Sequence, residues 1–436
     1  MSLLRIFQGR LALAGLVMGS ACANGEEPSE LYDVMVLDRI DEGSSFALQQ
    51  RALETVDDLD RLSGPEFRLR RGGTLRIQSR AGDVVRSGSY TGSEPPSLHY
   101  ELEEGVVVPR DEATLLMLST AYQFERVLAD LRAAVDDDTQ AALDARGALS
   151  VLFEPAVVFE TAALEVSVQG QPNAFFDPER WQFVIAGGSG AEHAPLAADA
   201  RVIAHELGHS IFQQAFFGGR GPTCDPAAAS ENASQAHFAG RWDREFAIDG
   251  LNEGFTGWLS FAVTGRADPL AVLEVPLDST FDVNVNERIR VDDHFRWSEV
   301  PKLEEPVNGS ENEPHCRGEY CIGTLFMRSL VASFLASGHD PSDSDARHEF
   351  SRPLVAALAG ALNTLQEMPL PLPTAEVARC EKRSEASLAY DPPIIGAFLQ
   401  GFLQGVPNDA KPALCRELIE RFEAGFPGEY RKACEP

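Results

Sequence analysis

Residues 202–212, VIAHELGHSIF, hold two histidines four positions apart, with a glutamate directly after the first. The surrounding apolar residues favour a buried helix, on which His205 and His209 lie one turn apart on nearly the same face. Two imidazoles in that position can bind one metal ion, while the carboxylate of Glu206 beside them can take a proton from a water molecule. The alternative is a helix whose histidines are merely buried and hydrogen-bonded, which is costly for an unliganded pair. The motif therefore predicts a metal site.

Two features of this helix bear on the rest of the site. Gly208 lies in its interior, where glycine costs about 1 kcal/mol relative to alanine, so we expect another element to approach closely there. A catalytic zinc also needs a third protein ligand and one open position. In the zincins that use a third histidine, a glycine and that histidine follow at fixed offsets, where this chain has Phe212 and Ala215. The third ligand must come from elsewhere.

Residues 249–265, DGLNEGFTGWLSFAVTG, offer the best third ligand. We expect this segment to begin after a loop and to continue as an apolar helix, with Glu253 near its start. Gly254 and Gly257 leave room for a second helix to pack closely. The alternative is that Glu253 only stabilises the positive end of a helix dipole. Together with the upstream histidine pair, the sequence favours Glu253 as a metal ligand.

With these two motifs the sequence resembles the gluzincin metallopeptidases, related in layout to the thermolysin and fungalysin families. In those families HExxH on one helix and NE on a later helix bind one zinc ion. The resemblance implies that His205, His209 and Glu253 bind Zn²⁺ and that Glu206 is the general base. It also implies that Asn252 hydrogen-bonds a zinc-binding histidine.

Residues 172–188, PNAFFDPERWQFVIAGG, extend the resemblance. They are similar to an edge strand that lies antiparallel to the bound peptide in thermolysin-like peptidases. Asn173 and Ala174 would then contact the substrate, since a strand with free backbone groups can receive an extended peptide. The alternative is an ordinary strand.

The chain departs from the family pattern at two places. Gly257 stands where the family has an acidic residue that orients the first histidine, so His205 needs another partner, for which Asp249 is a guess. Tyr320 stands where the family has an oxyanion-stabilising histidine. A tyrosine hydroxyl can donate to a developing oxyanion, and His315 is the second candidate for that role.

The leading functional hypothesis is a zinc-dependent endopeptidase acting on peptides or proteins, with Glu206 activating the attacking water. A second hypothesis is a catalytically inactive surface lipoprotein of zincin fold that binds peptide or protein. A third is an unrelated helical protein without metal, which requires both motifs to be accidental. The sequence leaves the cleavage preference and the oligomeric state open.

The predicted fold class is α+β: a thermolysin-like zincin core with a mixed sheet and an active-site helix, followed by a mainly helical subdomain. The expected divisions are a signal peptide (1–22), an N-terminal α+β region (23–110), the catalytic subdomain (111–266) and the helical subdomain (267–436). In the N-terminal region, residues 46–62 have helical spacing and residues 67–78 alternate around two glycines as in a hairpin. Residues 111–135 predict a long helix and residues 148–168 predict strands.

The N-terminus has a basic start, an apolar stretch and small residues before Cys22, as in a signal peptide. Cys22 is a candidate for lipidation, which predicts an outer-membrane or cell-surface lipoprotein; cleavage after Ala23 would instead give a periplasmic or secreted protein. The lipid anchor would be the only membrane contact. Six cysteines remain in an oxidising compartment, and Cys316 with Cys321 is the pair expected to form a disulfide. The net charge of −30 disfavours a nucleic-acid partner.

Overall fold

The computed structural model describes residues 31–39, 46–79, 86–161, 165–168, 173–177, 180–186, 196–217, 242–266, 296–297, 319–367, 392–423 and 429–435. The predicted signal peptide with Cys22, and also His315 and Cys316, lie outside the described residues. The side chains of Asn173, Asp249, Tyr320 and Cys321 lie outside them as well, although their backbones belong to described strands or helices. None of the described helices is both long and apolar enough to cross a membrane.

The described strands form three four-stranded sheets. The first has the order β2 (Phe46–Leu53), β1 (Tyr32–Arg39), β7 (Val106–Pro109) and β6 (Tyr100–Glu103). The second has the order β10 (Glu165–Val168), β9 (Ala156–Thr161), β4 (Thr74–Ser79) and β5 (Arg86–Thr91). The third has the order β11 (Asn173–Asp177), β12 (Gln182–Ala186), β8 (Leu149–Phe153) and β3 (Phe67–Arg71). Both parallel and antiparallel pairs occur in the third sheet, which is therefore mixed as predicted.

The predicted strands on either side of Gly72 and Gly73 form, but the predicted hairpin is wrong. β3 pairs in parallel with β8, and β4 pairs in parallel with β9, so the chain passes from one sheet to another at the two glycines. Both glycines have positive φ, which glycine adopts without steric cost. The chain also passes between the same two sheets from β8 to β9, directly beside the two glycines. There the Gly72 N–H donates to the backbone oxygen of Phe153, and the Ala156 N–H donates to the backbone oxygen of Gly73. The division expected at residue 110 therefore does not separate the sheets, because strands from both sides of it pair.

The helix suggested by residues 46–62 is also absent. Its first part forms β2, which pairs antiparallel with β1 over the whole length of both strands. The later apolar positions Val56 and Leu59 are buried nonetheless. The helical spacing was misleading because pairing with β1 satisfies the backbone of this segment as a strand, and tertiary context outweighs a weak local pattern.

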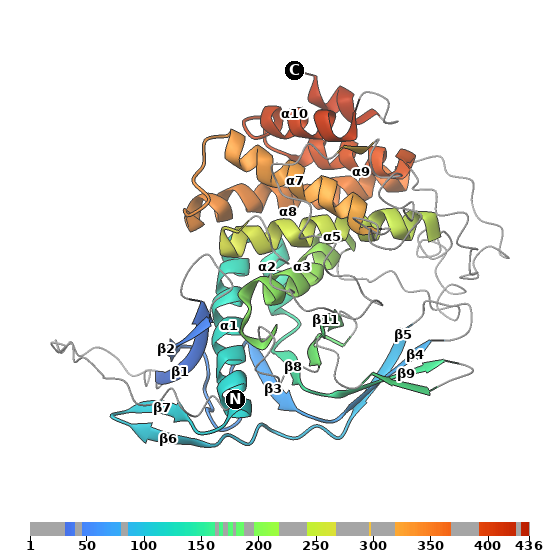
Figure 1. The fold of residues 1–436 in the computed structure, drawn as a ribbon. Coiled ribbons are helices and arrows are strands. Elements are labelled where there is room, and N and C mark those ends of the chain that lie inside the picture. The colour runs from blue at the N-terminus through green and yellow to red at the C-terminus, as the bar shows by residue number, and fades with distance from the viewer. Residues whose placement is uncertain are drawn as a thin grey trace, which may run out of the picture.

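Most of the other described residues are helical. The helices are α1 (Glu112–Ala134), α2 (Asp137–Asp144), α3 (Ala200–Phe217), α5 (Trp242–Thr264), α7 (Glu319–Ala336), α8 (Ser344–Glu367), α9 (Pro392–Gly405) and α10 (Lys411–Phe422), with short 3₁₀ helices η2 (Leu196–Ala198) and η7 (Glu429–Cys434). In Figure 1 the strands lie at one end, α7 to α10 lie at the other, and α3 and α5 lie between them. The predicted α+β class and the mainly helical C-terminal half are confirmed for the described residues.

One hydrophobic core runs from the strands through α1, α3 and α5 into the C-terminal helices. Aromatic rings form its centre beneath α3 and α5: Phe212 of α3 and Phe255 of α5 pack together and against Phe398 and Phe402 of α9. Phe326 of α7 completes this group. Phe212 and Phe255 are close in sequence to the predicted ligands, so the same packing that buries them also holds the two ligand-bearing helices together.

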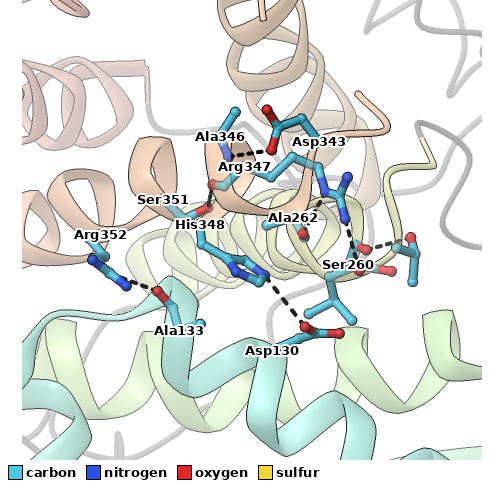
Figure 2. Close-up of polar contacts among 12 residues, drawn as sticks. Asp130, Ala133, Ser260, Ala262, Asp343, Ala346, Arg347, His348, Ser351 and Arg352 are labelled. Atoms are coloured by element: carbon cyan, nitrogen blue, oxygen red, sulfur yellow. Dashed lines mark hydrogen bonds and ion pairs between the residues drawn. The ribbon is translucent and has the colours of Figure 1, made fainter. Parts of the chain in front are cut away.

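Polar contacts join α8 to α1 and α5 (Figure 2). The buried guanidinium of Arg347 donates to the backbone oxygens of Ala262 and Val263 at the C-terminal end of α5. His348 Nε2 lies 3.7 Å from Oδ1 of Asp130 in α1, and Arg352 donates to the backbone oxygen of Ala133. These residues form the α8 polar cluster.

A disulfide joins Cys415 of α10 to Cys434 of η7. It was not singled out from the sequence, because spacing alone does not decide connectivity. The predicted Cys316–Cys321 disulfide stays a prediction, because Cys316 and the side chain of Cys321 lie outside the described residues. The observed disulfide ties the last helical turns of the chain to α10.

Candidate metal centre

The two histidines of α3 and Glu253 of α5 come together as the sequence predicts. His205 Nε2 lies 3.2 Å from Glu253 Oε2, and His209 Nε2 lies 3.7 Å from Glu253 Oε1. One donor atom from each of the three residues lies within 4.8 Å of the other two. Because His205 and His209 are one helical turn apart, the regular geometry of α3 brings both rings to the same side, facing α5.

Close helix packing produces this convergence. A Cβ added to Gly208 would lie 3.1 Å from Cα of Thr256, so α3 and α5 cross with almost no space at that point. On the other side of α5, a Cβ on Gly254 would lie 2.4 Å from the backbone oxygen of Gly323 in α7. The expected close approach at Gly208 and the expected tight packing of a helix at Gly254 are both confirmed.

Glu253 lies in the middle of α5 and not near its start. The helix begins at Trp242, well before the loop boundary expected from the sequence. A residue in the helix interior gains little from the helix dipole, which acts within the first and last turns. The alternative explanation of Glu253 as a dipole-stabilising residue is therefore wrong, and its position facing two histidines needs another cause.

The donor set fits a zinc ion. Zinc bonds of about 2.0–2.2 Å in a tetrahedral arrangement place neighbouring ligand atoms roughly 3.3–3.6 Å apart, close to the two distances from Glu253 to the histidines. Two imidazoles and one carboxylate are also a known ligand set for a catalytic zinc that keeps a fourth position open. The site is largely enclosed, since the His205 side chain is 7 % exposed and that of Glu253 is 20 % exposed.

The charges of the site compensate one another. Burial alone would lower the pKa of His205, but its hydrogen bond to Glu253 and the negative charges of Glu253 and Glu206 raise that pKa overall. Burial would raise the pKa of Glu253, but attraction to His209 and His205 lowers it. The carboxylate form of Glu253 is thus favoured by positive charge between it and the two histidines, which a proton or a metal ion can supply.

Glu206 lies beside the ligands and not among them. Its Oε2 is 4.0 Å from His209 Nε2, and its side chain is 17 % exposed. Burial raises the pKa of Glu206, while the attraction of His205 and His209 and a hydrogen bond from the backbone N–H of Phe176 act in the opposite direction. The carboxylate therefore lies between the histidine pair and strand β11, where a general base for a water near the metal would be needed.

Strand β11 is an edge strand among the described residues, since it pairs there only with β12. The backbone N–H of Phe176 points to Glu206 and so away from β12. In an antiparallel ladder residues two apart direct their N–H and C=O groups to the same side, so those of Ala174 also lie along this outer edge. Ala174 therefore lies on an outer edge of the sheet, and its role as a substrate contact stays a prediction. The side chain of Asn173 is not described, and its role stays a prediction.

Gly257 of α5 faces the side chain of Met327 in α7. A Cβ at this position would lie 2.7 Å from Sδ of Met327, so a larger residue there requires the Met327 side chain to move. The partner of His205 is instead Thr256, whose Oγ1 lies 3.2 Å from His205 Nδ1. Thr256 was not identified from the sequence. Its spacing of three residues from Glu253 places both on one helix face, but the spacing does not show that this face meets Gly208.

The other predicted residues are not brought into the site by any described contact. Asn252 makes no hydrogen bond to a histidine among the described residues, and its Oδ1 is buried without a partner there. The backbone of Tyr320 lies at the start of α7, but its side chain and all of His315 are outside the described residues. The roles predicted for Asn252, Tyr320 and His315 remain predictions.

In comparisons with known proteins, no protein-family model, no curated protein and no solved structure matches the chain. The resemblance to gluzincins therefore rests on the motifs and on the geometry that joins His205, His209 and Glu253.

Proposed function

We propose that this protein is a zinc-dependent endopeptidase. The observation that carries the proposal is the enclosed group of His205, His209 and Glu253, with the carboxylate of Glu206 beside it. A structural zinc site has four protein ligands and no need of a neighbouring base, whereas three ligands and an adjacent carboxylate are typical of a hydrolytic site.

Bound by these three residues, zinc would lower the pKa of a water toward about 7 and polarise the scissile carbonyl. Glu206 would accept the proton of the attacking water and deliver it to the leaving amine. Burial raises the pKa of Glu206, so its carboxylate is a stronger base than that of an exposed glutamate. The Phe176 N–H would keep this carboxylate in place.

Strand β11 supports a peptide as the substrate class. Its outer edge presents the N–H and C=O of Ala174, two residues before the N–H that Glu206 accepts, and an extended peptide can pair with such an edge as an additional strand. This pairing recognises backbone and not side chains, so it suits an endopeptidase that binds an extended internal segment. The export predicted from the N-terminal residues and the net charge of −30 would suit an extracellular protein substrate.

The test is the zinc content and peptidase activity of the full-length protein beside Glu206→Gln. Both proteins should bind one zinc per chain, and Glu206→Gln should cleave an unstructured protein such as reduced casein about 10²–10⁴ times more slowly. Glu420→Gln, a half-exposed glutamate on α10, is the matched control and should keep full activity. Equal activity of Glu206→Gln and wild type would remove Glu206 from the mechanism.

The same experiment separates the enzyme from the binding-protein hypothesis. If the wild type holds zinc and binds casein without cleaving it, the chain is an inactive zincin-like binding protein. If no zinc is bound after purification without chelator, the proposed metal site is wrong.

A further inference from the structure

Thr256 of α5 lies where α5 crosses α3, and it contacts both His205 and Gly208 of α3. It is fully buried in α5. Its Oγ1 donates to the backbone oxygen of Glu253 at 2.8 Å and lies 3.2 Å from Nδ1 of His205. One hydroxyl thus links the backbone of one predicted ligand to the ring of another.

Counting protons fixes the direction of the second contact. A threonine hydroxyl has one hydrogen and two lone pairs. Since the hydrogen of Thr256 is directed to the Glu253 carbonyl, Oγ1 faces His205 as an acceptor, and His205 Nδ1 must carry the proton. In the neutral tautomer with its proton on Nδ1, the other ring nitrogen, Nε2, has a lone pair that a metal ion can use in place of a proton, and it is Nε2 that faces Glu253. Only that tautomer can bind a metal through Nε2.

Packing holds the hydroxyl in this orientation. The Cγ2 methyl of Thr256 would lie 3.2 Å from a Cβ on Gly208, and its own Cβ would lie 3.1 Å away. The methyl therefore faces Gly208 of α3. Rotation of Thr256 about χ1 would move the methyl away from Gly208 and turn Oγ1 away from His205. Gly208 and Thr256 together determine where Oγ1 points.

We propose that Thr256 is the positioning residue of the metal centre, which holds His205 in the tautomer and orientation that bind zinc. In the gluzincin pattern the residue with this role is an acid at the position of Gly257. Here the role would belong to Thr256, the residue before it. This inference rests on the proposed zinc site and adds to it a neutral hydroxyl, in place of a carboxylate, as the partner of the first histidine. A neutral partner makes the imidazole a weaker donor than a carboxylate partner does.

The experiment measures zinc affinity of the full-length protein by competition with a chromophoric chelator, for wild type, Thr256→Val and Thr256→Ser. Valine keeps the shape and removes the hydroxyl, and serine keeps the hydroxyl. Thr256→Val should bind zinc about 10–100-fold more weakly, and Thr256→Ser should recover most of the loss.

Ser260→Ala is the matched control for the packing of α3 on α5. Ser260 lies one turn further along α5, is fully buried, and donates to the backbone oxygen of Arg201 in α3 without touching a ligand. It should lower thermal stability but leave zinc affinity unchanged. Because zinc binding and not turnover is measured, the outcome does not depend on the protein being a peptidase.

Three results would overturn the inference. Equal zinc affinity of Thr256→Val and wild type would show that the hydroxyl does not position His205. Equal weakening by Thr256→Val and Ser260→Ala would assign the effect to helix packing. A wild type that binds no zinc would refute the proposed function itself. This result differs from the first two, in which the wild type does bind zinc.

Discussion

At the crossing of α3 and α5, three side chains that can bind a metal ion face one another, whereas two arginines face backbone oxygens where α8 meets α1 and α5. In the first region His205, His209 and Glu253 point their lone-pair atoms to one place. In the α8 polar cluster Arg347 and Arg352 donate to backbone oxygens (Figure 2). Acceptors that converge require a shared cation, whereas donors matched with acceptors are complete without one. The difference separates a binding site from a structural contact.

The largest effect is expected at the metal centre. Glu253→Ala removes a predicted ligand and should weaken zinc binding by more than the 10–100-fold typical of residues that only support a ligand. Chelator competition measures this change. The same titration on Arg347→Met, a buried charge of the α8 polar cluster, should give the wild-type zinc affinity. Retained zinc affinity in Glu253→Ala would remove the distinction between the two regions.

Helix packing beneath the site gives the next effect. Gly254→Ala places a methyl where only 2.4 Å separates it from the backbone oxygen of Gly323, so α5 and α7 must move apart. Overpacking of this kind should lower the free energy of unfolding by about 1–3 kcal/mol, measured by urea denaturation. Gly147→Ala, on an open turn with nothing within 4 Å, tests the cost of positive φ without a clash. A smaller loss for Gly254→Ala than for Gly147→Ala would contradict the close packing.

Arg347→Met should lower the free energy of unfolding by about 1–3 kcal/mol, because it leaves the backbone oxygens of Ala262 and Val263 buried without a donor. Arg352→Met, whose hydrogen bond is exposed, should cost less than about 1 kcal/mol. Urea denaturation of the two variants measures the difference. Equal losses of unfolding free energy in the two variants would show that burial does not determine how much each hydrogen bond of the α8 polar cluster contributes.

The smallest effect is a pH dependence of stability at His348. Burial lowers the pKa of this histidine, against the attraction of Asp130 and Asp345, while Arg347 and Arg352 lower it further. A lowered pKa means that the unfolded chain binds a proton more readily, so stability falls as pH drops below the ordinary histidine pKa of about 6.5. The loss between pH 7.5 and 5.5 should therefore be smaller in His348→Gln than in wild type, in thermal unfolding at both pH values. An equal loss would contradict the direction of the shift.

The sequence predicted the ligand group because helical periodicity converts spacing into geometry. His205 and His209 are one turn apart, and Gly208 and Gly254 mark where neighbouring helices come close. Thr256 could not be assigned in the same way, since its role depends on which face of α5 meets α3. The α8 polar cluster could not be predicted either, because its arginines donate to backbone oxygens, which every residue has.

The strands show the same limit. Alternation identified β3 and β4, but nothing in residues 67–78 states that their partners are β8 and β9, far along the chain. Similarly, the spacing in residues 46–62 favours a helix, but residues 46–53 form a strand because they pair with β1. Local pattern predicts an element, while its partners depend on contacts distant in sequence.

The central claim, that His205, His209 and Glu253 bind one zinc ion, is tested most directly by anomalous scattering at the zinc edge from crystals of the protein purified without chelator. The account predicts a single strong peak about 2.0–2.2 Å from Nε2 of both histidines and from a carboxylate oxygen of Glu253. No peak at this place, or a peak bound by other residues, would contradict it.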